Sequence, residues 1–133
     1  MNKEAQYHLR KAARFIRPVE RRAESDEPET IVSTAYYAMF HAACAVVLEQ
    51  EGRLPKTHSS LIGRFGLIVR DRASKDREFG ATLHDAFELR AVGDYEIEAR
   101  IGRVDALASR DEARAFIACC RKLLRDRSNP TKG

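Results

Sequence analysis

Arg90, Asp94 and Tyr95 are the residues whose types and spacing most clearly indicate chemistry in this sequence of 133 residues. The segment from Phe79 to Phe87 places apolar side chains on one face of a predicted helix, and Arg90 and Asp94 continue that face. A guanidinium on a core-facing stripe is costly unless its charge is paired and its donors are used. Asp94, one turn further on, can supply the charge, and Tyr95 can supply a hydroxyl.

Arg90 has two interpretations, and the residues leave both open. In the structural interpretation Arg90 is a buried ion-pair residue, or the stripe simply leaves the core at the end of the helix. In the functional interpretation Arg90 points into a cleft and binds phosphate, which a guanidinium recognises through two parallel hydrogen bonds.

Tyr37, His41 and His58 are further candidates for contacts with a phosphate or with RNA. Tyr37 and His41 share a helix face and could reach the same cleft as Arg90. His58 opens a later predicted helix. In the plainer interpretation His41 is a hydrogen-bonded packing residue, and His58 caps its helix or contacts a neighbour.

Arg10, Arg14 and Arg17, together with Arg21, form a basic stripe on the first predicted helix. Such a stripe usually marks a solvated face. If the protein binds RNA, the stripe is the natural track for phosphates, and binding would then fall steeply with salt. The net charge of +4 permits a polyanionic partner but does not require one.

The sequence predicts neither a metal site nor a cofactor site. The three cysteines are odd in number, and Cys119 and Cys120 are neighbours that point apart on a helix. The chain has no phosphate-binding glycine loop, no dinucleotide-binding glycine pattern and no metal-ligand spacing. No disulfide framework follows, and a reducing cytosol fits best.

Apolar side chains at helical spacing predict five helices and no strand. Pro18 is expected to kink or shorten the first helix. The second helix has Ser25 or Asp26 as its cap, and Ser109 with Glu112 makes a capping box for the fifth. The approximate bounds of the five helices are 3–22, 27–51, 58–70, 74–93 and 109–127.

The segment 35–48 is apolar on almost every face, so it should be the central helix of the bundle. The predicted fold is therefore all-α, an up-and-down bundle of four to five helices. The bundle spans residues 1–127, and residues 128–133 form a disordered tail. The first residues lack an apolar signal region, and no apolar run approaches the roughly 20 residues that cross a bilayer. We therefore expect a cytoplasmic protein without a membrane segment.

Three segments together carry a family resemblance: AYYAMFHAA from Ala35 to Ala43, PKTHSSLI from Pro55 to Ile62, and FELRAVGDYE from Phe87 to Glu96. They resemble the HEPN domains, specifically the small stand-alone prokaryotic branch, over nearly the whole chain. The resemblance implies a helical bundle that is usually dimeric. It also implies an activity, because many members are metal-independent endoribonucleases, while others bind nucleotides or have lost activity. Many pair with a small nucleotidyltransferase as toxin and antitoxin.

Arg90 matches the arginine of active HEPN members, which carry a histidine four to six residues later. No histidine follows His84 in this chain, and Tyr95 stands where that histidine could be. Tyrosine, with a pKa near 10, is a poor base. Pairing with Arg90 would lower the pKa of Asp94 and so its basicity. The resemblance also makes Tyr95 a candidate for adenylylation by a partner nucleotidyltransferase.

The leading hypothesis is a HEPN-type homodimer that binds RNA or nucleotide phosphates, with two copies of Arg90 and Tyr95 lining a cleft across the two-fold axis. In its active form it is a toxin-like ribonuclease that needs no metal and is held in check by a nucleotidyltransferase antitoxin. The alternative is a non-catalytic dimeric module that binds nucleotide or protein. A third hypothesis is a structural helical adaptor, in which Arg90 and Asp94 form a buried ion pair.

Overall fold

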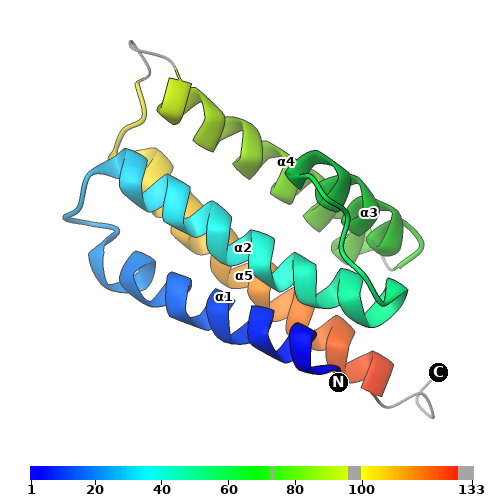
Figure 1. Cartoon of the computed structure of the whole chain (residues 1–133). Helices are drawn as coiled ribbons and strands as arrows, with labels where there is room; N and C mark the ends of the chain where they lie inside the picture. Colours follow the sequence, from blue (N-terminus) through cyan, green and yellow to red (C-terminus); the bar gives the residue numbers. More distant parts are fainter. Residues whose placement is uncertain (73, 96–99, 129–133) are drawn as a thin grey trace.

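The computed structural model describes residues 1–72, 74–95 and 100–128. Within these ranges the chain forms five α-helices and no strand, and the long helices run alternately up and down (Figure 1). This confirms the predicted all-α fold. The helices are α1 (Lys3–Arg22), α2 (Pro28–Glu51), α3 (His58–Arg70), α4 (Ser74–Tyr95) and α5 (Arg103–Ser128).

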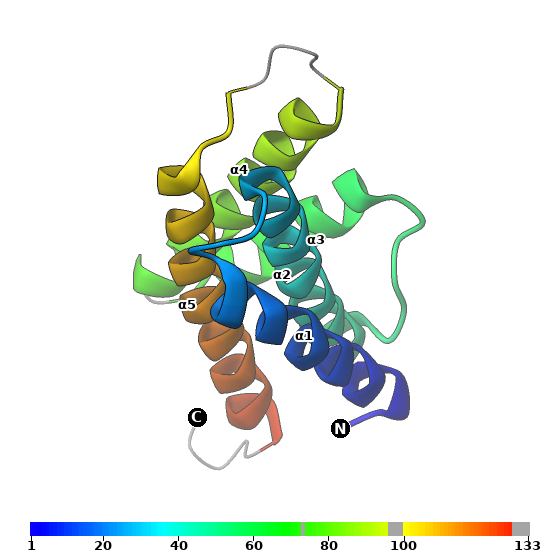
Figure 2. The same ribbon diagram turned by 90° about the vertical axis from the view of Figure 1, so that its left-hand side faces the viewer.

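The central helix is α2, as its composition predicts. It packs against each of the other four helices, and Figure 2 shows it in the middle of the bundle. Every residue from Ala42 to Leu48 is buried, so all faces of this stretch meet protein. The expectation that no apolar run approaches the length of a membrane span is wrong for α2, which alone among the described helices is long and apolar enough to cross a membrane. However, 72% of its most apolar window is buried inside the bundle.

The connection between α1 and α2 differs from the predicted cap. The N-cap of α2 is Glu27, and Pro28 occupies the first turn, where its missing N–H costs no helical hydrogen bond. Ser25 and Asp26 instead belong to the end of α1, because their N–H groups donate to the carbonyl of Arg22 at 3.1 and 2.9 Å. The prediction that Ser25 or Asp26 caps α2 is therefore wrong.

The start of α5 also differs from the prediction. The helix begins at Arg103 rather than at about residue 109, so Ser109 and Glu112 lie within the helix and form no capping box. A carboxylate oxygen of Asp105 accepts the N–H of Gly102 at 2.8 Å and closes the first turn. This contact is one half of a capping box, in which Asp105 takes the role that the prediction gave to Glu112.

The other boundaries lie close to the predicted ones. Helix α1 continues through Pro18 without ending there, α3 has its predicted bounds, and α4 runs on to Tyr95. Gly52 ends α2 with a φ of 78°, a left-handed conformation that glycine adopts without strain. The predicted disordered tail lies outside the described residues from position 129 onward, and Ser128 still belongs to α5.

Two contacts fix the region where α4 ends and α5 begins. The guanidinium of Arg103 donates to the carbonyl oxygens of Ala23 at 2.8 Å and Asp26 at 2.6 Å. A Cβ atom at Gly93 would lie only 2.8 Å from Cδ1 of Ile101, so glycine is what allows this close approach. The contacts of Arg103 therefore anchor the start of α5 to the α1–α2 connection, and Ile101 lies close against the last turns of α4, which carry the candidate site.

Candidate functional site

Arg90 lies over the rings of two consecutive tyrosines of α2. Its guanidinium carbon is 5.0 Å from the ring centre of Tyr37 and 5.7 Å from that of Tyr36. A cation over an aromatic face is attracted by the ring, most strongly where water is partly excluded. About a fifth of the Arg90 side chain is exposed, at 19%. We call Tyr36, Tyr37, His58, Arg90 and Asp94 the arginine cluster.

Asp94 supplies the carboxylate that the spacing predicts. Its Oδ2 lies 3.1 Å from Nε of Arg90, but the N–H does not point at it: this Nε is the only described side-chain nitrogen or oxygen that is buried without a hydrogen bond. No described residue accepts a hydrogen bond from the two terminal nitrogens of Arg90. Because 39% of the Asp94 side chain is exposed, the pair is neither fully buried nor saturated.

His58 enters the arginine cluster through the hydroxyl of Tyr36, which lies 2.7 Å from its Nδ1. Tyr36 is fully buried, and the half-buried ring of His58 stacks on Phe40 with ring centres 4.0 Å apart and planes 8° apart. Burial lowers the pKa of His58, and the charge of Arg90 lowers it further. Burial raises the pKa of Tyr36, with Arg90 opposing. Both groups are therefore neutral at neutral pH.

His41 belongs to a different group, on the α1 side of α2. Its Nδ1 lies 2.9 Å from Nδ1 of His8, and its ring stacks on Phe15 with centres 5.6 Å apart. Burial lowers the pKa of His41 to about 4, and His8 contributes. We call His8 and His41 the histidine pair. Of the two residues predicted to share a cleft with Arg90, the described contacts join Tyr37 to it and do not join His41.

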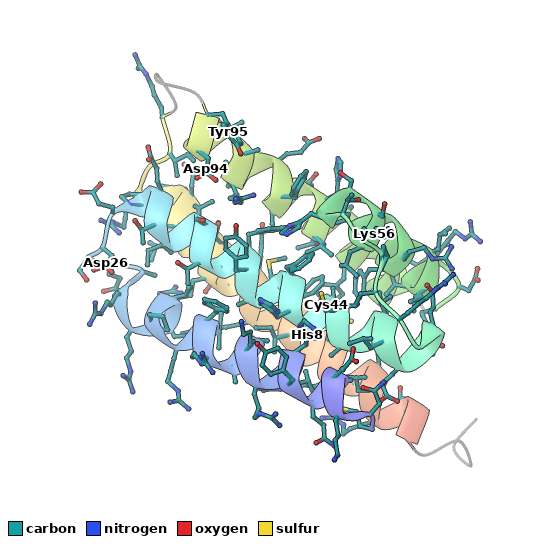
Figure 3. All side chains as sticks on the ribbon, in the orientation of Figure 1. His8, Asp26, Cys44, Lys56, Asp94 and Tyr95 are labelled. Carbon is teal, nitrogen blue, oxygen red and sulfur yellow. The ribbon has the colours of Figure 1, made fainter. Side chains whose placement is uncertain are left out.

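Tyr95 ends α4 and is 79% exposed, and Figure 3 shows it beside Asp94 at that end of the helix. Among the described residues it makes no contact with Arg90. Arg10, Arg14 and Arg17 are all exposed on α1, and within the described ranges none of them forms an ion pair. They form a basic surface separate from the arginine cluster.

A model of the HEPN domain matches residues 5–128 of this chain. The chain belongs to the HEPN domain family. A UPF0332 protein of Archaeoglobus fulgidus is 34% identical over 116 residues, which cover 86% of this chain and 90% of that protein. A Methanocaldococcus jannaschii protein named as a putative toxin is 30% identical over 95 residues, which cover 71% of this chain and 69% of that protein.

The histidines of this HEPN domain lie in three separate surroundings. His84 pairs with Glu88 at 2.9 Å on the exposed side of α4, and the histidine pair lies against α1. His58 alone lies in the arginine cluster. The sequence indicates no partner for His58 and gives no sign of His8. Each pairing joins residues on two different helices, 22 positions apart for Tyr36 with His58 and 33 positions apart for His8 with His41, so both depend on how the helices pack.

Three further features of the described part of the chain concern other kinds of site. It contains no group of three or more histidine, cysteine, aspartate or glutamate side chains that could hold a metal ion. Cys44, Cys119 and Cys120 are buried and free. A hollow of about 600 Å³ beside the α2–α3 connection contains no residue of the arginine cluster. Its lining consists of Glu51, Arg53, Leu54, Pro55, Lys56, Ser60 and Arg64.

Proposed function

We propose that this HEPN protein binds RNA or nucleotide phosphates at the arginine cluster and acts as a metal-independent endoribonuclease toxin of a toxin–antitoxin pair. The observation that carries the proposal is the state of Arg90. Its guanidinium is held by Asp94 and by two tyrosine rings, while its terminal nitrogens have no acceptor among the described residues. A fixed guanidinium with free donors is suited to a phosphate group.

The proposed reaction is an internal transesterification of RNA. The 2′-oxygen bonds to phosphorus as its proton passes to a water molecule, and the bond from phosphorus to the 5′-oxygen breaks as that oxygen takes up a proton from Tyr95 or from water. Arg90 stabilises the negative charge that develops on the phosphate oxygens. Asp94 orients Arg90, and Tyr95 of either copy in a homodimer positions or protonates the substrate.

The family and the toxin-named relative support an antitoxin as a partner of this protein. The protein forms a homodimer in the cytoplasm, with the two copies of Arg90 lining one cleft. A nucleotidyltransferase antitoxin restrains it. The exposed hydroxyl of Tyr95, at the end of α4, is open to a modifying enzyme and is the proposed adenylylation site. Arg10, Arg14 and Arg17 add a track for phosphates, and His41 is less suited to it because its Nδ1 is already bonded.

A second candidate is a non-catalytic dimeric module that binds nucleotide or protein. The observation that favours this module is the absence of a histidine four to six residues after Arg90. Tyr95 stands where the motif histidine could be, and no contact joins it to Arg90 among the described residues, so no histidine base stands at the position where active members carry one. Such a module would keep the phosphate contact of Arg90 and would cut nothing.

The test is cleavage of end-labelled RNA by the purified protein in the presence of a chelator. We expect cleavage by the natural chain and a loss of about a hundredfold or more in Arg90→Ala. Arg114→Ala is the matched control, because Arg114 also pairs with a carboxylate, that of Glu20 at 3.2 Å, but lies on α5 away from the cluster. Unchanged cleavage in Arg90→Ala would remove Arg90 from the mechanism. Saturable binding without cleavage would decide for the non-catalytic module.

A further inference from the structure

The hydrogen bond between Tyr36 and His58 has a defined direction. Tyr36 is fully buried, and a buried hydroxyl needs an acceptor for its proton. Nδ1 of His58, at 2.7 Å, is the only acceptor that the described residues offer. The O–H therefore donates to Nδ1. A neutral imidazole that accepts at Nδ1 carries its own proton on Nε2.

The ring of His58 is also fixed in orientation. It stacks on Phe40, meets the ring of Tyr37 edge-on with centres 6.3 Å apart, and lies 6.3 Å from the ring of Phe87. Nε2 makes no hydrogen bond to a described residue and is absent from the buried, unpaired atoms. Its N–H group is thus a donor held in a set direction.

His58 and Arg90 approach the same pair of tyrosines. Arg90 lies over both rings, and His58 contacts both from the start of α3. Phe87, which lies beside His58, precedes Arg90 on the same face of α4 by less than one turn. Two sets of donors, one charged and one neutral, therefore converge on this part of α2.

We propose that Tyr36 fixes His58 as the Nε2–H tautomer, so that His58 and Arg90 together bind one phosphodiester of RNA and His58 does not serve as the base. The proposal rests on the proposed function and deepens it. Tyr36 is then a positioning residue that acts through His58. A base would instead need a lone pair on Nε2, which this tautomer lacks.

The tautomer is tested by nitrogen-15 NMR of histidine-labelled protein at pH 7.5, with His58 assigned by comparison with His58→Gln. We expect a protonated Nε2 and an unprotonated Nδ1. In Tyr36→Phe the donor to Nδ1 is lost, and a mixture of tautomers should appear. A protonated Nδ1 in the natural chain would overturn the proposal. This measurement needs no RNA, so it can fail or succeed separately from the proposed function.

The phosphate contact is tested with two variants of His58 and two RNAs. Glutamine can place an amide N–H where Nε2–H lies, whereas alanine cannot. With a 2′-O-methyl RNA oligonucleotide, which cannot be cleaved, we expect His58→Ala to weaken binding about tenfold and His58→Gln to restore most of it. Cleavage of unmodified RNA should follow the same order.

Abolished cleavage with intact binding in His58→Gln would identify His58 as the base and overturn the proposal. Unchanged binding in both variants would remove His58 from the phosphate contact. If the natural chain binds neither RNA, the proposed function fails together with the phosphate contact, while the NMR result still decides whether Tyr36 sets the tautomer.

Discussion

The arginine cluster and the histidine pair lie side by side on α2. They contain similar side chains but differ in the hydrogen bonds that these side chains make. Each contains a half-buried imidazole that stacks on a phenylalanine, Phe40 for His58 and Phe15 for His41. In the histidine pair each Nδ1 is taken by the other imidazole. In the arginine cluster the partner of His58 is a buried hydroxyl, and a guanidinium lies nearby.

The difference teaches what makes a buried polar group available for binding. In the histidine pair both Nδ1 atoms take part in one contact between α1 and α2, so the pair contributes to the packing of these two helices. The arginine cluster leaves Nε2 of His58 and the terminal nitrogens of Arg90 without an acceptor among the described residues. Tyr36 occupies Nδ1 of His58, and the Asp94 carboxylate lies beside Nε of Arg90. Tyr37 of the arginine cluster also contacts Phe15, the ring on which His41 stacks, so the two groups adjoin there.

The largest effect on stability should come from the tyrosine that anchors the arginine cluster. Tyr36→Ala removes a fully buried aromatic side chain and should lower the free energy of unfolding by about 3–5 kcal/mol. Phe15→Ala, beside the histidine pair, removes a ring that is only half-buried and should cost less. Urea unfolding followed by circular dichroism measures both. Equal losses of unfolding free energy in the two variants would show that Tyr36 and Phe15 contribute equally to stability.

The histidine pair should make stability depend on pH. Burial depresses the pKa of His41 to about 4 in the folded chain, against an ordinary value near 6.5. Between these values the unfolded chain binds more protons, so stability is full above pH 6.5 and is lost as the pH falls toward 4. Because solvent screens the half-exposed ring, the expected loss is about 1–2 kcal/mol.

The control for this pH dependence is His41→Phe, compared with the natural chain by urea unfolding at pH 7.5 and pH 4.5. The variant keeps the stacking on Phe15 and lacks the titrating group, so it should lose less stability between the two pH values. His58 also has a lowered pKa, and its contribution remains in the variant. An identical loss in both chains would assign the pH dependence to groups outside the histidine pair.

The fold could be predicted because its signals are local. The all-round apolar stretch identifies α2 as the central helix, and α3 has its predicted bounds. The start of α5 has a local signal too, the N–H of Gly102 donating to Asp105, which the prediction missed. The contacts of Arg103 with the carbonyls of Ala23 and Asp26, about 80 positions earlier in the chain, could not be predicted from local spacing.

In the candidate site, too, contacts within one helix could be predicted from the sequence, whereas contacts between helices could not. Arg90 and Asp94 are one turn apart on a single helix, so their ion pair is visible in the sequence. The bond from Tyr36 to His58 joins α2 to α3, and its existence depends on how these helices pack. The exposure of Tyr95 likewise depends on where α4 ends relative to the rest of the bundle. Local spacing carries none of this information.

Arg90→Ala should separate a binding residue from a structural one. Removing the side chain loses an ion pair whose carboxylate is already 39% exposed and a contact with two rings. We expect a loss of about 1 kcal/mol in the free energy of unfolding. Breaking a fully buried pair typically costs about 3–5 kcal/mol. A loss of that size, measured by urea unfolding, would favour the structural adaptor.

The smallest expected effect belongs to the basic stripe of α1, which contributes charge and no fixed geometry. Arg10, Arg14 and Arg17 are exposed and lack ion pairs among the described residues, so each can meet one phosphate. Arg14→Gln should weaken RNA binding only a few-fold and reduce the slope of log affinity against log salt by about 0.7, the value for one contact with a single strand. Arg90→Lys should instead weaken binding at every salt concentration and leave the slope unchanged, because lysine keeps the charge and loses the forked donors. Fluorescence anisotropy with labelled RNA from low to moderate salt distinguishes the two patterns. The same slope change in both variants would mean that the arginine cluster attracts phosphate by charge alone, and its geometry would then add nothing to binding.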